Sequence, residues 1–395
     1  MPPSSDQPGD SEESRRDAHW GSGASYAGDA PLFSVVVPTW HGAMEWLGEC
    51  LEGIRAQREH VPEVLVVFDG PAEEARALTR RILPAARHLP FRDQRGFAAA
   101  ASAGLRAARG RLVALLNDDA VAQPDWLESM ADAADRHPNV GSFASRVLRA
   151  DDPSMLDSAG HGLTRWGEPF ALGHGSPDGP PFHVERPVFG APACAAVYRW
   201  ELLRDVGAFD VDFGAYLEDV DLSLRAQVMG FSCLYVPSAR VFHRGSSSYG
   251  WGPDGDGTAE RLVARNRVRL MLKSMPRNAL RAAAIPALAS IAADLAWRAV
   301  PGSDAHHGAA ALVGTLEGLR DARASVAARG PALGGRRVDD EAVRRVLGDA
   351  EAHLQEMGGA GGGRARRLQL AQRLARWVDR REERIKHPLF ATEAS

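Results

Sequence analysis

The chain has 395 residues, 45% of them hydrophobic and 25% charged, and a formal net charge of −4 at pH 7. This length and composition allow one or two domains with a sizeable core, and the slightly negative charge excludes a global basic surface, so no nucleic-acid partner is expected. The three cysteines (Cys50, Cys194 and Cys233) are far apart and have no Cys-x-x-Cys spacing, which argues against a disulfide scaffold or a thiolate metal site and is typical of a reducing compartment.

The first 31 residues are rich in Ser, Gly, Pro and Asp and contain no apolar segment of the kind that a signal peptide carries. Their composition predicts a disordered leader. No run in the chain reaches the ~18–20 apolar residues that a membrane-spanning helix needs. The longest candidate, AAAIPALASIAADLAW, is interrupted by Pro286 and Asp294. We therefore expect a cytoplasmic protein.

From residue 32 onward, short apolar runs alternate with segments of helical periodicity. The predicted strands are LFSVVVP, EVLVVFDG and RLVALL. The predicted helices are AMEWLGECLEGIRAQ, GFAAAASAGLRAARG and PDWLESMADAADRH. Apolar strands that alternate with helices indicate an α/β fold with a parallel sheet covered on both faces. In such sheets, ligands bind beyond the carboxyl ends of the strands.

Polar residues follow three of these predicted strands: Pro38-Thr39, Asp69-Gly70 and Asn117-Asp118-Asp119. We expect them to meet at one edge of the sheet. The adjacent carboxylates of Asp118 and Asp119 repel each other unless a cation lies between them, and Mg²⁺ combines such carboxylates with substrate phosphates. The alternative is a simple turn in which one of the two carboxylates caps the next segment.

Residues 150–187 are rich in Gly, Pro and His, and they predict a long excursion with little regular structure. A helix follows near residue 217, and a strand then leads to His243. Glu218, Asp219 and Asp221 crowd the start of this helix, where acidic residues are favoured by the helix dipole. One of them is alternatively a general base for a hydroxyl nucleophile. His243 is either structural or a ligand better suited to Mn²⁺ than to Mg²⁺.

The remainder of the chain predicts helices. We expect a helical extension over 256–354, a Gly-rich linker over 355–366, and a basic amphipathic helix and tail over 367–395. Within the extension, Ile285, Leu288, Ile291 and Leu295 share one face of a helix. Two interpretations of the basic helix stay open: it lies on an anionic membrane surface, or it packs on the protein itself or in a dimer.

Four motifs in this order resemble those of the family 2 glycosyltransferases, which have the GT-A fold. They lie in FSVVVPTWHGAMEWLGECLEGIRAQ, EVLVVFDGP, QRGFAAAASAGLRAARGRLVALLNDDAVAQPDWLE and GAFDVDFGAYLEDVDLSLRAQVMGFSCLYVPSARVFHRGSSS. The resemblance covers roughly residues 32–250, and the Asn-containing variant of the DxD motif is similar to that of rhamnosyl- and galactofuranosyl-transferring relatives.

The resemblance implies a GT-A catalytic domain over 32–255 with a mainly parallel central sheet, and an inverting hexosyltransferase that depends on Mn²⁺ or Mg²⁺. The donor would be a nucleotide-diphospho-sugar and the acceptor a glycan or lipid-linked hydroxyl in cell-surface glycan or glycolipid synthesis, with association at the inner membrane face. Asp219 would be the catalytic base, and Asp119 and His243 would hold the metal. The implied donor-binding residues are Pro38, Thr39, Asp69, Gly96, Asn117 and Asp118. The implied acceptor-binding residues are Gly190, Ala191, Cys194 and Glu218.

The chain departs from the family pattern at three places. Asn117 replaces the first Asp of the DxD motif, and an amide is a weaker, uncharged ligand. Trp40-His41 replaces a common Tyr-Asn pair, and Ser102 stands where relatives often have Asn. The Asn117 and Trp40-His41 departures support an alternative, a catalytically inactive GT-A-fold protein that binds sugar nucleotides or acts as a scaffold. A nucleotidyltransferase ranks lower, because VVVPTWHG offers no Lys or Arg for a triphosphate.

Overall fold

The computed structural model describes residues 31–40, 44–245, 256–298 and 305–356, and from Pro31 onward these belong to one compact unit. Residues 1–30 of the expected leader, His41, residues 357–366 of the expected linker and the expected basic C-terminal helix lie outside the described residues. The first two residues of the expected linker, 355 and 356, are helical. The strands of the central sheet are β1 (Phe33–Thr39), β2 (Glu63–Phe68), β3 (Arg87–Pro90), β4 (Leu112–Leu116), β5 (Ala120–Ala122), β6 (Val140–Arg149), β7 (Leu156–Ser158), β10 (Arg186–Val188), β11 (Ala195–Arg199) and β12 (Ser232–His243).

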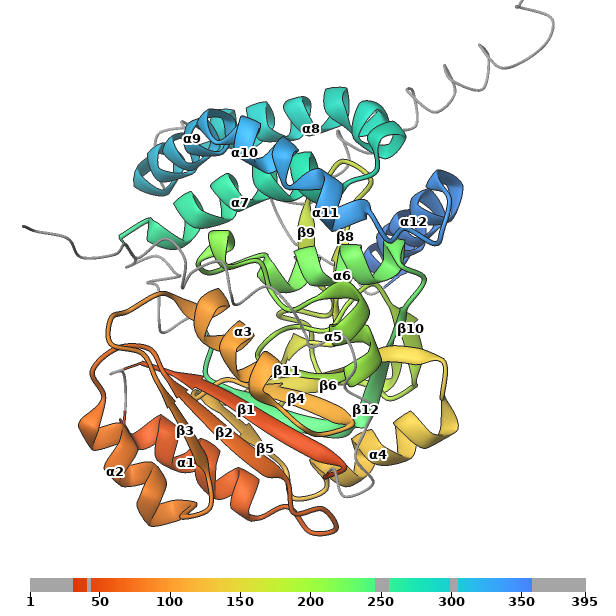
Figure 1. Ribbon diagram of the computed structural model, residues 1–395. Coiled ribbons are helices and arrows are strands. Elements are labelled where there is room, and N and C mark those ends of the chain that lie inside the picture. The colour runs from red at the N-terminus through yellow and green to blue at the C-terminus, as the bar shows by residue number, and fades with distance from the viewer. Residues whose placement is uncertain (1–30, 41–43, 246–255, 299–304, 357–395) are drawn as a thin grey trace, which may run out of the picture. The chain divides into compact units, whose positions relative to one another are not determined.

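The main path of this sheet runs β10-β12-β6-β11-β4-β1-β2-β3 (Figure 1). Strands β3, β2, β1 and β4 are parallel neighbours, and β12 also runs parallel to β6. Strand β11 lies antiparallel between β4 and β6. The predicted α/β class, with a central and mostly parallel sheet and a helical C-terminal region, is therefore confirmed.

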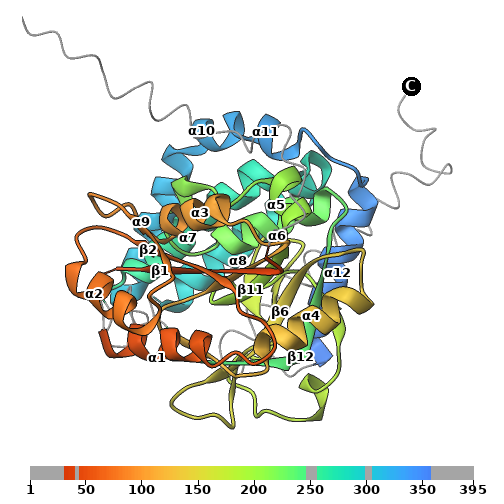
Figure 2. The same ribbon diagram turned by 60° about the horizontal axis from the view of Figure 1, so that its bottom comes forward.

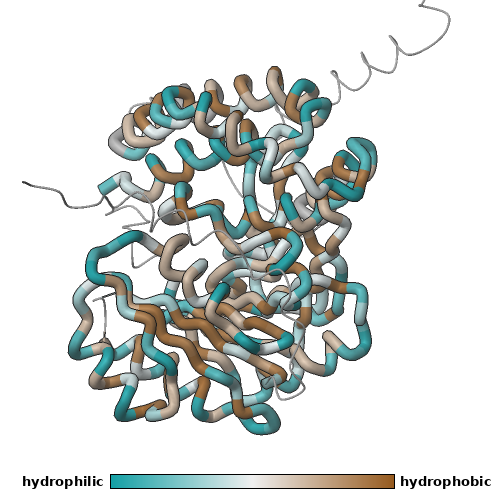
Figure 3. Tube along the Cα trace, in the orientation of Figure 1, coloured by the Kyte–Doolittle hydropathy of each residue, from teal (hydrophilic) through white to brown (hydrophobic). Residues whose placement is uncertain are grey.

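The two faces of the sheet are covered by different helices (Figures 1 and 2). Helices α1 (Met44–Arg55) and α4 (Trp126–Arg136) pack on one face, and α3 (Phe97–Ala107) packs on the other. A Cβ at Gly104 would lie 2.2 Å from Val36 Cγ1, so α3 approaches β1 more closely than any residue with a side chain would allow. Burial on both faces explains why the strands read as unbroken apolar runs, which Figure 3 shows as continuous hydrophobic segments.

Residues 150–187 differ from the sequence-based expectation. They contain β7 and β10, which pair with β6 and β12, and a hairpin of β8 (His161–Leu163) with β9 (Pro169–Ala171). Trp166 is fully buried in the turn of this hairpin. The prediction of a segment with little regular structure is wrong in this respect, because strands of three residues are too short to show an alternating pattern.

The remaining helices lie between strands or after the last strand. Helix α2 (Glu73–Ile82) precedes β3, and helices α5 (Trp200–Val206) and α6 (Glu218–Val228) lie between β11 and β12. The predicted C-terminal helices are α7 (Thr258–Ser274), α8 (Arg277–Arg298), α9 (Ala305–Arg320), α10 (Ala322–Ala327), α11 (Arg329–Leu333) and α12 (Asp340–Glu356). In α8, Ile285 and Leu288 are exposed, whereas Ile291 lines a cavity. The side chain of Leu295 lies outside the described part of the chain. Among the described helices, none has the length and apolarity to cross a bilayer.

Candidate active site

The carboxyl ends of the parallel strands border a cavity of about 260 Å³. Its walls come from the end of β1, the residues just after β2 and β4, the last residue of β12, the loop before β11 and the start of α6. Ten residues singled out in the sequence line it: Pro38, Thr39, Asp69, Asn117, Asp118, Asp119, Cys194, Glu218, Asp219 and His243. Parallel strand order therefore brings together side chains that lie up to two hundred positions apart in the sequence.

Asp69 is a buried carboxylate with both oxygens engaged by backbone. Its Oδ1 accepts a hydrogen bond from the Arg95 N–H at 2.6 Å, and its Oδ2 accepts one from the Gly96 N–H at 2.8 Å. Gly96 has a φ of 90°, a left-handed conformation that favours glycine, and it directly precedes helix α3. Asp69 thus holds the loop that leads into α3. Gly96 itself does not line the cavity.

Asp118 and Asp119 have different surroundings although they are neighbours. The Thr39 hydroxyl donates a hydrogen bond to Asp118 Oδ2 at 2.7 Å. Burial, together with the adjacent Asp119 charge, raises the pKa of Asp118 to about 7, against the opposing effect of the Thr39 hydrogen bond. Asp118 therefore exchanges a proton near neutral pH.

Asp119 belongs to a chain of acidic and imidazole groups. His243 Nε2 lies 3.3 Å from Asp119 Oδ1, and His243 Nδ1 lies 2.7 Å from Asp157 Oδ2. Although burial alone would lower the pKa of His243, hydrogen bonds to Asp119 and Asp157 raise it to about 10. The pKa of Asp157 is held below its usual range by His174 and His243 in spite of burial. The sequence did not point to Asp157, because it lies in the segment where no periodic element was expected.

These residues fit a divalent cation. Asp119 offers a carboxylate, and His243 offers an imidazole nitrogen once a bound ion displaces the proton that Asp119 and Asp157 hold on that ring. This donor set suits Mn²⁺. The buried Asn117 Oδ1 has no hydrogen-bond partner among the described residues, so an amide oxygen is also available at the cavity. Cys194 Sγ lies within 4.8 Å of ligand atoms of Asp157 and His243. Burial raises the pKa of that thiol well above its usual value, which leaves it protonated and a poor ligand.

Asp219 lies in the first turn of helix α6 and lines the same cavity as Asp119. Its Oδ2 accepts a hydrogen bond from the Ala193 N–H at 3.0 Å, and its Oδ1 accepts one from the Val220 N–H at 2.8 Å. His161 Nδ1 lies 3.7 Å from Asp219 Oδ2. Burial lowers the pKa of His161, so the neutral form of this imidazole is favoured and it forms no strong ion pair with Asp219.

The two residues before α6 are strained. Tyr216 and Leu217 have φ values of 67° and 65°, a conformation that costs a non-glycine residue roughly 1–2 kcal/mol. Asn266 of helix α7 stabilises this loop, because its Nδ2 donates to the carbonyls of Phe213, Ala215 and Tyr216 at 2.7–2.9 Å. Strain of this kind is tolerated where a particular side-chain placement is required. Here it places Glu218 and Asp219 at the cavity.

Glu218 is buried, and its Oε2 has no hydrogen-bond partner among the described residues. Burial, and then the neighbouring Asp219 charge, raises the pKa of Glu218 well above its usual value. The raised pKa favours the protonated form of Glu218, which can donate a hydrogen bond. Gly190 and Ala191, expected in the acceptor site, line no cavity described here; Gly190 instead pairs through its backbone with His161.

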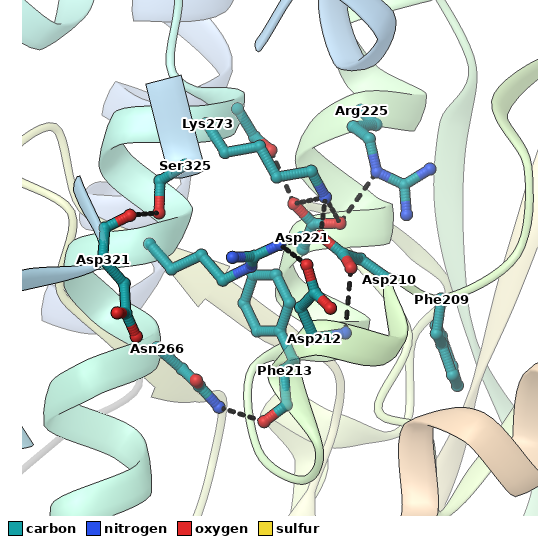
Figure 4. Close-up of polar contacts among 12 residues, drawn as sticks. Phe209, Asp210, Asp212, Phe213, Asp221, Arg225, Asn266, Lys273, Asp321 and Ser325 are labelled. Atoms are coloured by element: carbon teal, nitrogen blue, oxygen red, sulfur yellow. Dashed lines mark hydrogen bonds and ion pairs between the residues drawn. The ribbon is translucent and has the colours of Figure 1, made fainter. Parts of the chain in front are cut away.

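Helix α6 is tied to helix α7 by buried charges (Figure 4). Asp221 is fully buried, and it contacts Arg225 Nε at 2.8 Å, Lys273 Nζ at 2.9 Å and the Ser274 hydroxyl at 2.5 Å. Lys273 also pairs with Asp210 at 2.8 Å. The helix that carries Asp219 is thus anchored to the C-terminal helices.

The fold and this site define an α/β protein whose ligand cavity lies beyond its parallel strands, with an acid–imidazole cluster and a carboxylate at a helix start. The family model "Glycosyl transferase family 2" matches residues 34–173, and "Glycosyl transferase family group 2" matches residues 112–253. The two models together match residues 34–253, and the chain belongs to glycosyltransferase family 2.

The individual relatives share only moderate sequence identity with this chain. An uncharacterised protein of Sinorhizobium fredii is 28% identical over 239 residues, which are 56% of this chain and 25% of that protein. The N-acetylglucosaminyl-diphospho-decaprenol L-rhamnosyltransferase of Mycobacterium tuberculosis is 32% identical over 152 residues, which are 36% of this chain and 49% of the enzyme. The chain thus spans a quarter to a half of these relatives. A solved mannosyltransferase of Pyrobaculum calidifontis, in complex with GDP-Man and Mn²⁺, is 18% identical with a TM-score of 0.43, covering 91% of this chain and 88% of that one.

Proposed function

We propose that this protein is an inverting, metal-dependent glycosyltransferase that moves a sugar from a nucleotide-diphospho-sugar to an acceptor hydroxyl in glycan or glycolipid synthesis. The observation that carries the proposal is one cavity in which Asp119 and His243 share a wall with Asp118, while Asp219 lines the same space from the start of α6. Family membership and the name of the rhamnosyltransferase relative support the same reaction class.

Each group in the cavity then has a chemical task. Asp119 and His243 would hold a divalent ion, with Asn117 as a further oxygen donor, and the ion would supply charge stabilisation for the departing diphosphate. Asp69 positions the loop before α3, and Thr39 and Asp118 complete the donor side of the cavity. Asp219 accepts the proton of the acceptor hydroxyl as that oxygen attacks the anomeric carbon. A single displacement inverts the configuration at that carbon.

The first prediction is release of nucleoside diphosphate. The full chain is incubated with Mn²⁺ and each of dTDP-rhamnose, UDP-galactofuranose, UDP-glucose and GDP-mannose, and free nucleoside diphosphate is measured. We expect at least one donor to be consumed, and excess EDTA to stop its consumption. No release from any nucleotide-sugar, under conditions where the folded protein binds one of them, would instead support the inactive sugar-nucleotide-binding protein.

The second prediction concerns Asp157. A metal-binding histidine is usually oriented by a carboxylate on its other nitrogen, and loss of that partner typically costs 10–100-fold in metal affinity. Because Asp157 contacts His243 Nδ1 at 2.7 Å, we expect Asp157→Asn to weaken Mn²⁺ binding by about 10–100-fold. Electron paramagnetic resonance of free Mn²⁺, in the presence of nucleoside diphosphate, measures this affinity directly.

A matched control is available on the same segment. Asp151 is an exposed carboxylate that pairs with Arg149, so Asp151→Asn should leave Mn²⁺ affinity unchanged. Equal affinities of the Asp157→Asn variant and the unmodified protein would show that His243 does not need its carboxylate partner, and the metal role of His243 would then be in doubt.

A further inference from the structure

Residues 213–217 form a loop that leads directly into helix α6 and so into Asp219. Tyr216 and Leu217, the last two residues before the helix, both have positive φ values. This backbone geometry is unfavourable for a residue with a side chain, and it persists only where the surrounding structure imposes it. Contacts from elsewhere in the molecule must therefore hold the loop in its observed shape.

The side-chain amide of Asn266, on helix α7, supplies these contacts. Its Nδ2 lies 2.9 Å from the carbonyl oxygen of Phe213, 2.8 Å from that of Ala215 and 2.7 Å from that of Tyr216. An amide nitrogen carries only two hydrogens, so the three carbonyls share them. Figure 4 shows the amide directed at the Phe213 carbonyl. Asn266 is fully buried, so water does not replace these hydrogen bonds.

The orientation of this amide is itself fixed by the preceding residue. Arg265 Nε donates a hydrogen bond to the side-chain oxygen of Asn266 at 3.0 Å, which leaves the amide nitrogen directed at the loop. A terminal nitrogen of Arg265 also donates to the Phe213 carbonyl at 2.6 Å. Two consecutive residues of α7 therefore bind the same loop, one of them through the other.

The start of the loop is held on the donor side without help from Asn266. The Ala98 N–H, in the first turn of α3, donates to the Gly214 carbonyl at 2.8 Å. The same carbonyl oxygen would lie 3.2 Å from a Cβ at Gly96, whose N–H binds Asp69. Loss of the Asn266 amide would therefore release the end of the loop next to α6 and leave its donor-side end in place.

The position of Asp219 depends on that released end. Asp219 follows Leu217 by two residues, and its carboxylate accepts hydrogen bonds from the N–H groups of Ala193 and Val220. Relaxation of the positive-φ residues would move the start of α6, and with it this carboxylate, relative to the loop that carries Ala193. A misplacement of about 1 Å caused by a distant mutation can cost about 10²-fold in rate.

We propose that Asn266 is a positioning residue for the catalytic base: it holds residues 213–217 in their unfavourable conformation and thereby sets where Asp219 meets the nucleophile. The proposal rests on the glycosyltransferase function proposed above. Asn266 lines neither of the two described cavities, so it acts through Asp219 and not on a substrate. Helix α7 is then a working part of the catalytic unit.

The test uses the full chain, Mn²⁺ and the nucleotide-sugar that the unmodified protein consumes, with water as the nucleophile and release of nucleoside diphosphate as the signal. Asp219 takes a proton from water, the water oxygen bonds to the anomeric carbon, and the bond from that carbon to the diphosphate breaks. We expect Asn266→Ala to lower kcat at least tenfold and to leave the donor KM within threefold, because the donor-side contacts do not involve Asn266.

Two other results would count against the proposal. An unchanged kcat, or a donor KM that rises as much as kcat falls, would overturn the positioning role while donor turnover by the unmodified protein still supported the proposed function. Absence of turnover by the unmodified protein would overturn the proposed function and this inference with it.

A second substitution separates positioning from a mere loss of stability. Leu217→Gly removes the side chain that makes a positive φ unfavourable, and glycine is accepted at the residue before a helix. We expect the double variant Asn266→Ala/Leu217→Gly to recover kcat at least threefold relative to Asn266→Ala. No recovery, with both proteins folded, would show that Asn266 does not act by holding this conformation.

Ser145→Ala is the matched control, because it also removes a buried hydrogen bond. Trp126 Nε1 donates to the Ser145 hydroxyl at 2.9 Å, and neither residue lines a described cavity. We expect this variant to have a lower thermal unfolding midpoint and a kcat within twofold of the unmodified protein. If Asn266→Ala does not fold, Arg265→Ala removes the hydrogen bond that orients the amide and should lower kcat at least threefold. An unchanged kcat in folded Arg265→Ala would then overturn the proposal.

Discussion

Replacement of Asp219 by Asn is expected to lower the rate of sugar transfer by about 10²–10⁴-fold, the range that general-base catalysis typically contributes. Asn is nearly isosteric with Asp, and its side-chain oxygen can still accept one of the two backbone hydrogen bonds, from Ala193 or Val220. What it loses is the ability to take a proton from the attacking hydroxyl. The loss should therefore appear in kcat, with donor binding close to that of the unmodified protein.

The measurement is initial-rate transfer at saturating donor, with circular dichroism and thermal unfolding to show that the variant is folded. Glu201→Gln, an exposed carboxylate on α5, is the control and should keep full activity. Glu218→Gln is the informative comparison, because the raised pKa of Glu218 favours its protonated form and Gln also offers a hydrogen-bond donor. If Glu218→Gln abolished transfer while Asp219→Asn kept more than a tenth of the rate, the base would have to be reassigned to Glu218.

The parts of the fold that the sequence predicted are those with long periodic signals. Strands β1, β2 and β4 are continuous apolar runs because both their faces are covered, and helices α1, α3 and α4 have a buried face of several residues. Strands β7, β8 and β9 have three residues each, which is too few for a pattern to emerge. They are held by pairing, β8 with β9 and β7 with β6, and such short partners leave no alternating pattern in the sequence.

The same distinction applies to the site. The side chains after β1, β2 and β4 were predicted to meet because parallel strands end at one edge, and they line one cavity. Asp157 and His161 come from the short strands of residues 150–187, so no rule of strand order connected them with His243 or Asp219. The cavity that Ile291 lines is formed by hairpin β8–β9 and helices α7, α8 and α9. No sequence motif predicts that these segments pack together.

The anchoring of helix α6 gives the second large effect, which is on stability. Asp221→Ala is expected to lower the free energy of unfolding by about 3–5 kcal/mol, the usual cost of removing one partner of a buried ion pair. Asp221 is fully buried, and its removal leaves Arg225 and Lys273, with side chains 6% and 7% exposed, without the carboxylate between them (Figure 4). Urea titration or the thermal unfolding midpoint measures the loss.

Asp212→Ala is the matched control in the same cluster. Its carboxylate also pairs with a basic residue, Arg269, but its side chain is 66% exposed, so the expected cost is only about 0–1 kcal/mol. Similar losses in the two variants would mean that burial does not set the strength of this network. A loss below about 1 kcal/mol for Asp221→Ala would contradict the anchoring role directly.

The pH dependence gives an independent check on the same residue. Although burial by itself raises the pKa of Asp221, the charges of Arg225 and Lys273 lower it from 3.8 to about 2. A carboxylate with a lowered pKa in the folded state stabilises that state above its unfolded pKa and loses this contribution as the pH falls through its folded pKa. The stability difference between the unmodified protein and Asp221→Ala should therefore be constant from pH 7 to about 5 and shrink as the pH falls from about 4 toward 2. A difference that stays constant across this range would show that the effect of Asp221 comes from packing and not from its charge.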